Sequence, residues 1–345
     1  MTNAAPVTSR LRAYFEFIAA IVYFFLARSV ARHSAAGLVS DTLEPLLEQA
    51  MLAFLLFLGY AAFGMTFDRQ KRPMREQGFP PRDGWQREVG LGVALGWGIA
   101  VVCVLLMALF GGIAVALTLN PSAFAWLAAD IAFFVVATLA EEIAFRGYGF
   151  QRFAQSVGPV AATLSFAALY AAVQATLPGA SHASIAVSLA FGLVLTIAYL
   201  RTQALWVSWG LNFGWKASRA LLFGLTVAGV NSHSPLIEGD PMGPFWVTGG
   251  GFGLDASWFA FLVLLLAIPV LYRATRDLDF LHNAPVLVPG GIPVDLDAAA
   301  RRQHESAMGQ AAPAASSLVQ IIPAQAPAGS NPTSASGSIE TTSQQ

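Results

Sequence analysis

The sequence predicts an all-α fold: a polytopic transmembrane helical bundle of about eight spans, followed by a disordered C-terminal tail. Hydrophobic residues make up 56% of the 345 positions and charged residues only 11%, whereas a soluble domain carries about a quarter charged residues. Several apolar runs reach the roughly 20 residues that a helix needs to cross a bilayer. Backbone groups cannot remain unpaired in lipid, so each run is expected to be helical.

The first apolar run is the weakest of the candidate spans because Glu16 interrupts it. Arg10 and Arg12 precede the stretch "FIAAIVYFFLA", which resembles the core of a signal peptide. However, Arg28 and Arg32 stand where a small-residue cleavage site is needed, which favours an uncleaved helix over a signal peptide. The candidate spans lie at residues 13–31, 46–66, 89–117, 123–145, 157–177, 183–200, 204–225 and 257–273.

Lysine and arginine residues predict the orientation of these helices. The connection 67–88 holds six of them, and the connections 118–122, 178–182 and 226–256 hold none. Because cytoplasmic loops carry the excess of Lys and Arg, both termini are expected in the cytoplasm. Arg28 and Arg32 run against this bias, so the first helix is the part of the topology that it supports least.

The composition divides the chain into three parts. Residues 1–44 form an N-terminal segment with the weak first helix, and residues 45–273 form the transmembrane core. Residues 274–345 are rich in Ala, Ser, Pro, Gly and Gln, and such a segment cannot bury enough surface to offset the entropy of ordering, so it is predicted to be a disordered cytoplasmic tail. A net charge of −1 gives no argument for nucleic acid as a partner, and membrane lipid is expected.

The stretch "EEIAFRGY" at 141–148 places two carboxylates and a guanidinium at the end of an apolar run. Glu142 and Arg146 are four residues apart on one helix face, so they can pair. Glu141 points about 100° away and is left for a different neighbour. An ionisable group within a span is a functional-site hypothesis by default. The alternative is a structural ion pair at a helix end.

Two later helices carry polar stripes that could complete such a site. A lysine in the middle of a span needs a carboxylate or water nearby, and Glu141 is the candidate partner of Lys216. The alternative is that Lys216 reaches an interface with its long side chain. The stripes comprise Phe166, Tyr170 and Gln174 in 157–177, and Ser208, Asn212, Lys216 and Arg219 in 204–225.

The loop 238–257 is rich in glycine, which permits tight backbone turns. Phe245 and Trp246 within it suit the surface of a bilayer. It is either a lid over the site on the non-cytoplasmic side or a plain interfacial loop. The single cysteine, Cys103, lies in an apolar run, cannot form an intrachain disulfide and is expected to be a small core residue.

Several of these stretches, in this order, resemble the CPBP family, the CAAX-protease and bacteriocin-processing integral membrane proteins also called Abi. "EEIAFRGYGFQRF" resembles its EExxxR signature, and "LSFAALY" matches the position of its Phe-x-x-x-His motif. "LWVSWGLNFGWK" matches the third motif, where Leu-Trp leads into His-x-x-x-Asn. "WVTGGGFGLDAS" resembles a glycine-rich stretch of bacterial members, and the likeness covers about residues 45–273. The resemblance implies a bacterial inner membrane as the location.

The family's working members are intramembrane glutamic endopeptidases. There the first glutamate and the second-motif histidine activate water, and the third-motif histidine and asparagine steady the oxyanion. In this chain Tyr170 and Asn212 replace the two histidines, and Lys216 replaces the asparagine. The resemblance therefore implies six candidate catalytic residues: Glu141, Glu142, Arg146, Tyr170, Asn212 and Lys216.

These replacements affect the activation of water most directly. A general base works best with a pKa near ambient pH, whereas the tyrosine reference pKa is about 10. Tyr170 can therefore hydrogen-bond a water but rarely takes its proton. Asn212 and Lys216 could still donate to an oxyanion. A carboxylate pair without histidine is a poor zinc centre, so no metal is expected, and the resemblance implies no cofactor.

Three functional hypotheses follow from the sequence. The favoured one is a family member whose proteolytic mechanism is lost or altered, with Glu142–Arg146 and Glu141–Lys216 as structural pairs. The second is an active endopeptidase that uses Glu141 as its base and cleaves a peptide or a membrane protein. The third is a membrane scaffold or partner-binding protein, which is compatible with the first.

Overall fold

The computed structural model describes residues 7–69, 71–117, 121–229 and 237–282, and this part of the chain is predominantly helical. Within it, five helices are long and apolar enough to cross a membrane, and two further apolar helices, Pro159–Ala175 and Trp258–Ala274, are shorter. The prediction of an all-α polytopic membrane protein is confirmed. The expected count of eight spans is not confirmed.

The helices follow one another with short connections. The longer ones are α1 (Val7–Ala35), α2 (Glu44–Phe67), α4 (Trp85–Phe110), α5 (Pro121–Arg146), α6 (Tyr148–Val157), α7 (Pro159–Ala175), α8 (His182–Thr202), α9 (Leu205–Ala217) and α11 (Trp258–Ala274). The shorter ones are α3 (Pro73–Glu76), α10 (Phe245–Thr248) and α12 (Arg276–His282). A π-helical turn, Ser218–Leu222, extends α9, and two 3₁₀ turns cover Gly250–Phe252 and Leu254–Ala256.

The predicted helix 89–117 is wrong in its last part. Helix α4 ends at Phe110, and Gly111 and Gly112 follow, the latter with a φ of +102° that favours glycine. The chain then forms strand β1 (Ile113–Leu117), which pairs antiparallel with β2 (Ile237–Pro241). An apolar run without helical periodicity does not distinguish a strand from a helix, and the two glycines were the signal that ended the helix.

Several helix starts have a local cause in the sequence. Pro159 opens α7, where its missing N–H is not needed. Ser181 caps α8 through a reciprocal pair of hydrogen bonds with Ser184, whose backbone N–H donates to the Ser181 Oγ at 3.2 Å. Ser257 caps α11 by accepting from the Phe259 N–H at 3.2 Å. These residues fix where α7, α8 and α11 begin.

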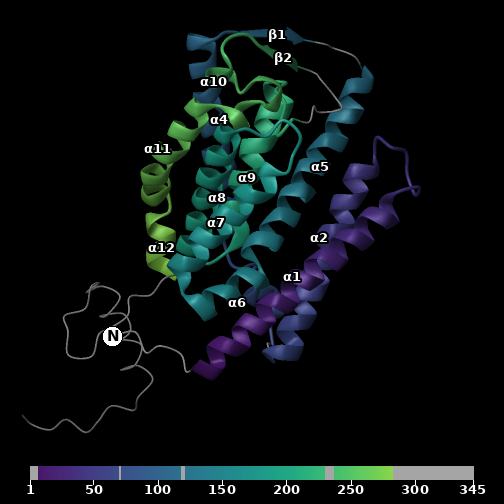
Figure 1. Cartoon of the computed structure of the whole chain (residues 1–345), viewed down its shortest axis with the longest axis vertical. Helices are drawn as coiled ribbons and strands as arrows, with labels where there is room; N and C mark the ends of the chain where they lie inside the picture. Colours follow the sequence, from purple (N-terminus) through teal and green to yellow (C-terminus); the bar gives the residue numbers. More distant parts are fainter. Residues whose placement is uncertain (1–6, 70, 118–120, 230–236, 283–345) are drawn as a thin grey trace, which may run out of the picture. The chain divides into compact units, whose positions relative to one another are not determined.

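The arrangement of the helices can be followed in Figure 1. Helix α1 packs along α2 and α6, and α2 packs along α5. Helix α5 contacts α9, which in turn packs on α4 and α8, and α7 lies beside α8. Helix α8 is the most deeply buried of the five long helices. Helix α5 therefore lies between the α1–α2 pair and the helices around α9.

The contact between α4 and α9 is made backbone to backbone. Gly92 and Gly96 on α4 face Gly210 and Gly214 on α9, and each of these pairs has the spacing of a Gly-x-x-x-Gly motif. A Cβ atom added at any of the four glycines would collide with backbone atoms of the opposite helix. This seam fixes the position of α9, which carries Asn212 and the other third-motif residues.

Helix α1 is held to its neighbours through Glu16, the charged residue that interrupts its apolar run. Glu16 is buried and accepts from Arg12 at 2.7 Å, and Arg152 of α6 lies 3.6 Å from its other oxygen. Arg152 also pairs with Asp68, just after α2, at 2.8 Å. The carboxylate in this apolar helix is thus neutralised by arginines of its own and a neighbouring element.

Helix α12 falls inside the segment 274–345 that the composition predicted to be a tail. This first part of the segment is therefore helical. Its Asp279 forms an ion pair with Arg201 of α8 at 3.0 Å, which holds α12 against the bundle. The predicted boundary at residue 274 follows the end of the last apolar run, and proline and glycine become frequent only after α12. The rest of the predicted tail lies outside the described residues.

Candidate functional site

The candidate site lies where the C-terminal half of α5 faces α9. The Trp209 Nε1 donates to the Val135 carbonyl of α5 at 3.1 Å and joins the two helices. Glu141 and Glu142 project from α5 into this contact, and Asn212 and Lys216 project from α9, one turn apart. The structure brings together residues that are about 70 positions apart in the sequence.

Glu142 and Arg146 form the predicted ion pair. The Arg146 Nη1 donates to the Glu142 Oε1 at 3.2 Å, and both side chains are buried. The Arg146 Nη2 also donates to the Gly192 carbonyl of α8 at 3.2 Å. The guanidinium therefore holds the carboxylate on α5 and ties that helix to α8.

Lys216 is the partner of Glu141. Its Nζ lies 2.5 Å from Oε1 and 2.7 Å from Oε2 of the glutamate, so the ammonium contacts both carboxylate oxygens. The Lys216 side chain is 12% exposed and that of Glu141 is 31% exposed. Lys216 thus points into the site and not toward an interface. A charge-assisted contact of this length is among the stronger polar interactions in proteins.

Asn212 links the two glutamates, a role that the sequence did not suggest. Its Nδ2 donates to the Glu141 Oε2 at 3.1 Å and to the Glu142 Oε1 at 3.0 Å, and its side chain is fully buried. The two hydrogens of one amide group serve both acceptors. The spacing of Asn212 one turn before Lys216 indicates that the two share a helix face, but it does not indicate contact with both carboxylates.

Tyr170 of α7 packs on the arginine and not on the carboxylates. Its ring centroid lies 5.6 Å from the Arg146 guanidinium carbon, within the range of a cation–π contact. The ring also packs against Phe145 and Phe191, with centroids 5.2 Å and 6.2 Å away. The tyrosine at this motif position therefore covers Arg146 with an aromatic face.

A cavity of about 410 Å³ opens onto the site. Glu141, Tyr170 and Lys216 line one part of it, and Gln174 and Arg28 line another. The rest of its wall is mainly apolar and aromatic and comes from α1, α2, α5 and α7. A mostly apolar cavity of this size with a few polar groups is typical of a ligand-binding site. Glu142, Asn212 and Arg146 do not line it and lie behind Glu141.

Two stripe residues lie elsewhere than the sequence suggested. Arg219 is on the π-helical turn, where its Nη1 pairs with the Asp255 Oδ1 at 2.9 Å and its Nε donates to the Trp215 carbonyl at 3.0 Å. Arg219 therefore contacts the glycine-rich loop and not the glutamates. Phe166 packs on aromatic residues of α1 and α6 and does not line the cavity.

The glycine-rich loop does not cover the cavity. No residue of the segment 238–257 lines it. The loop is instead fastened to the end of α9 by Asp255, which accepts from the Ala228 backbone N–H at 2.9 Å besides pairing with Arg219. The alternative of a plain interfacial loop agrees with these contacts better than a lid does.

Among the residues that the structure describes, no group of three or more His, Cys, Asp or Glu side chains is placed to hold a metal ion. Two carboxylates, two cations and one amide from α5 and α9 instead contact one another. Such an arrangement can stabilise the helix contact, and it can present Glu141 and Lys216 to whatever enters the cavity.

The fold and the site define a polytopic integral membrane protein with two adjacent glutamates in its helical core, of which Glu142 is buried and Glu141 lines a cavity. Residues 121–218 match the family described as type II CAAX prenyl endopeptidase Rce1-like. The matched segment runs from the start of α5 to the residue after α9 and contains all six candidate residues. The resemblance to the CPBP family is thereby confirmed for this segment. No curated protein and no solved structure matches the chain.

Proposed function

We propose that this protein is a CPBP-like intramembrane protein in which the ordinary hydrolytic mechanism of the family is lost, and in which Glu141 and Lys216 form a stabilising ion pair. The observation that supports this proposal most directly is the position of the Lys216 Nζ, 2.5 Å and 2.7 Å from the two Glu141 oxygens. An ammonium in that place neutralises the charge of a carboxylate that would otherwise be costly in an apolar environment.

The same contact works against catalysis by Glu141. A general base must direct a lone pair at the proton that it removes, at hydrogen-bond distance. Both oxygens of Glu141 already accept from Lys216, and Oε2 also accepts from Asn212. Tyr170, which stands in place of the second-motif histidine, contacts Arg146 instead. Loss of one such catalytic group typically lowers the rate by a factor of about 10² to 10⁴.

An active endopeptidase is the second candidate, because of the exposure of Glu141. Its side chain is 31% exposed and lines the cavity of about 410 Å³, so a peptide could reach it. In that case Glu141 would activate water once Lys216 had moved to the substrate oxygen, and Lys216 and Asn212 would donate to the oxyanion. A peptide or a membrane protein would be the substrate.

A non-hydrolytic protein would act by holding a membrane protein or peptide in the same cavity. We further infer from the distribution of Lys and Arg that both termini lie in the cytoplasm, and from the family resemblance that the membrane is a bacterial inner membrane. The net charge of the chain, −1, supports neither nucleic acid nor a strongly charged soluble protein as a partner.

The test restores the family's three motif residues. The triple variant Tyr170→His, Asn212→His, Lys216→Asn is expected to cleave membrane proteins that the parent leaves intact. Membranes from cells that carry the parent, the triple variant or neither are compared by quantitative proteomics of membrane-protein termini. New termini that appear only with the triple variant, and that disappear when Glu141→Gln is added to it, support the proposal.

The same experiment distinguishes the second candidate. Termini that are already present with the parent and that are lost in the single variant Glu141→Gln would refute loss of the mechanism and establish the endopeptidase. The folded amount of each variant is measured by size-exclusion chromatography, so that a missing terminus is not confused with missing protein.

A further inference from the structure

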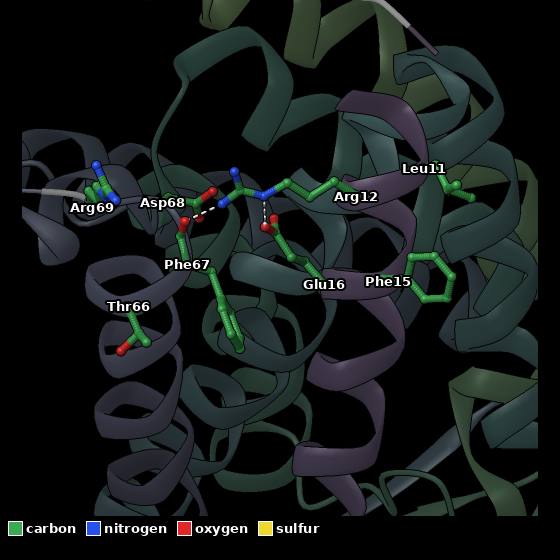
Figure 2. A pocket seen from close by; sticks show the side chains of 8 residues that line it. All are labelled: Leu11, Arg12, Phe15, Glu16, Thr66, Phe67, Asp68 and Arg69. Carbon is green, nitrogen blue, oxygen red and sulfur yellow. Dashed lines mark hydrogen bonds and ion pairs between the residues drawn. The ribbon is translucent and has the colours of Figure 1, made fainter. Parts of the chain in front are cut away.

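A second cavity lies between the start of α1 and the end of α2, and it shares no lining residue with the cavity at the glutamates. We call it the α1–α2 cleft. It has a volume of about 1030 Å³ and is open to one side. Figure 2 shows the side chains around it. They come from both helix ends: Leu11, Arg12, Phe15, Glu16, Thr66, Phe67, Asp68 and Arg69.

The two acidic side chains of the cleft are already neutralised. Glu16 accepts from Arg12 at 2.7 Å, and Asp68 accepts from Arg152 at 2.8 Å. Arg152 also lies 3.6 Å from Glu16. Arg12 donates in addition to the Phe67 carbonyl, which holds its guanidinium across the cleft, as Figure 2 shows. The carboxylates therefore organise the cleft and leave little negative charge to repel an anion.

The rim of the cleft carries an excess of positive charge. Arg69 lines it and is exposed, and its backbone adopts a left-handed φ of +53° at the end of α2. Lys71, Arg72 and Arg75 follow within six residues and are also exposed. Basic clusters directly beyond a transmembrane helix attract anionic lipid headgroups.

The other wall of the cleft is apolar. Leu11 and Phe15 on α1 are 55% and 63% exposed, and Phe67 at the end of α2 is 41% exposed. These side chains lie at the ends of two helices that are long enough to cross a membrane. At such a place a ligand meets water and positive charge on one side and hydrocarbon on the other. That combination fits a molecule with a charged head and a fatty chain.

We propose that the α1–α2 cleft binds the phosphate headgroup of an anionic phospholipid, with Arg12 and Arg69 facing the phosphate and with Leu11 and Phe15 along an acyl chain. Arg12 keeps a fixed position through Glu16 and the Phe67 carbonyl, and Arg69 supplies a charge that no acidic side chain of the cleft takes up. Occupancy of the cleft would join the ends of α1 and α2. This proposal is independent of the role of Glu141.

The test uses the full chain in nanodiscs of phosphatidylcholine with a small fraction of phosphatidylglycerol. Native mass spectrometry measures how much of each lipid stays bound after the disc is removed. The wild type is expected to retain phosphatidylglycerol in preference to phosphatidylcholine. Each Lys or Arg near an anionic headgroup strengthens binding about fivefold, so Arg69→Gln should lower retention about fivefold.

The matched control is Arg273→Gln, which removes one exposed arginine at the end of α11 and should retain phosphatidylglycerol as the wild type does. Equal loss in both variants would mean a general surface charge effect and would overturn the site. Equal retention of the two lipids by the wild type would overturn it as well.

Two further measurements complete the test. Inorganic phosphate added to the same mixed discs should not displace bound phosphatidylglycerol at millimolar concentration, and displacement there would show a site for free phosphate instead. Photoactivatable phosphatidylglycerol should label wild-type peptides that contain Leu11 or Thr66. Labelling of other segments alone would refute the proposal even if the arginine variant does not fold.

Discussion

The ion pair between Lys216 and Glu141 can be tested by a double-mutant cycle. The single variants are Lys216→Met and Glu141→Gln, and the third is their combination. Each single variant leaves one charge without its partner in the apolar contact between α5 and α9. The double variant removes both charges and keeps side chains of similar length, so the penalty of an unpaired charge disappears.

The expected size follows from the burial of the two side chains. Removing one partner of a fully buried ion pair costs about 3–5 kcal/mol. Glu141 is 31% exposed and can be hydrated from the cavity, so Lys216→Met should cost less, about 2–3 kcal/mol. Lys216 is only 12% exposed, so Glu141→Gln should cost about 3 kcal/mol. Because the double variant should cost only about 1 kcal/mol, the coupling energy of the cycle should be about 4–5 kcal/mol.

The assay is the apparent melting temperature in detergent, together with the fraction that elutes as folded protein. At about 2–4 °C per kcal/mol, each single variant should melt roughly 5–10 °C below the parent. Most of that loss should be recovered in the double variant. Lys71→Met is the control, because Lys71 is the other lysine of the chain and is exposed. It should melt as the parent does.

A strictly additive cycle would refute the reasoning. If Lys216→Met and Glu141→Gln lower the melting temperature independently, the contact contributes no coupling to the fold. The same conclusion would follow if Lys216→Met were as stable as the parent, and the retained glutamate would then need another explanation, such as catalysis.

The seam between α4 and α9 and the ion pair at the glycine-rich loop give two more predictions. Gly96→Leu should abolish folding, because a Cβ at Gly96 already collides with the α9 backbone, whereas Gly98→Leu on the open face of α4 should fold normally in a size-exclusion assay. Asp255→Ala should reduce the free energy of unfolding by about 3 kcal/mol and so lower the apparent melting temperature, because it leaves the buried Arg219 without its ion-pair partner. Adding Arg219→Met should recover most of that loss, and a double variant as unstable as Asp255→Ala would contradict this account.

Part of the site could be predicted because the spacing of residues along a helix determines which side chains share a face. Glu142 and Arg146 are four residues apart, and their pairing in the structure follows from the pitch of one helix. The approach of Lys216 to Glu141 could be inferred from energy alone, since few other places in an apolar core suit an ammonium. The double role of Asn212 could not, because it depends on the distance between α5 and α9.

The errors in the fold prediction have identifiable causes. The strand at Ile113–Leu117 has the same apolar composition as the helix before it, and its partner Ile237–Pro241 lies more than a hundred residues away. The sequence predicts one regular span over residues 204–225, in which Arg219 shares a face with Lys216. The structure has a π turn at Ser218–Leu222, which the sequence does not indicate, and Arg219 pairs there with Asp255.

The glycine seam has a consequence for how such a protein can change over time. Gly210 and Gly214 lie two positions from Asn212 and Lys216, so about 200° around the helix separates the side that docks on α4 from the side that meets the carboxylates. Substitutions on the side of α9 that meets the carboxylates therefore leave its contact with α4 unchanged. The packing of these two helices can be kept while the chemistry of the site changes.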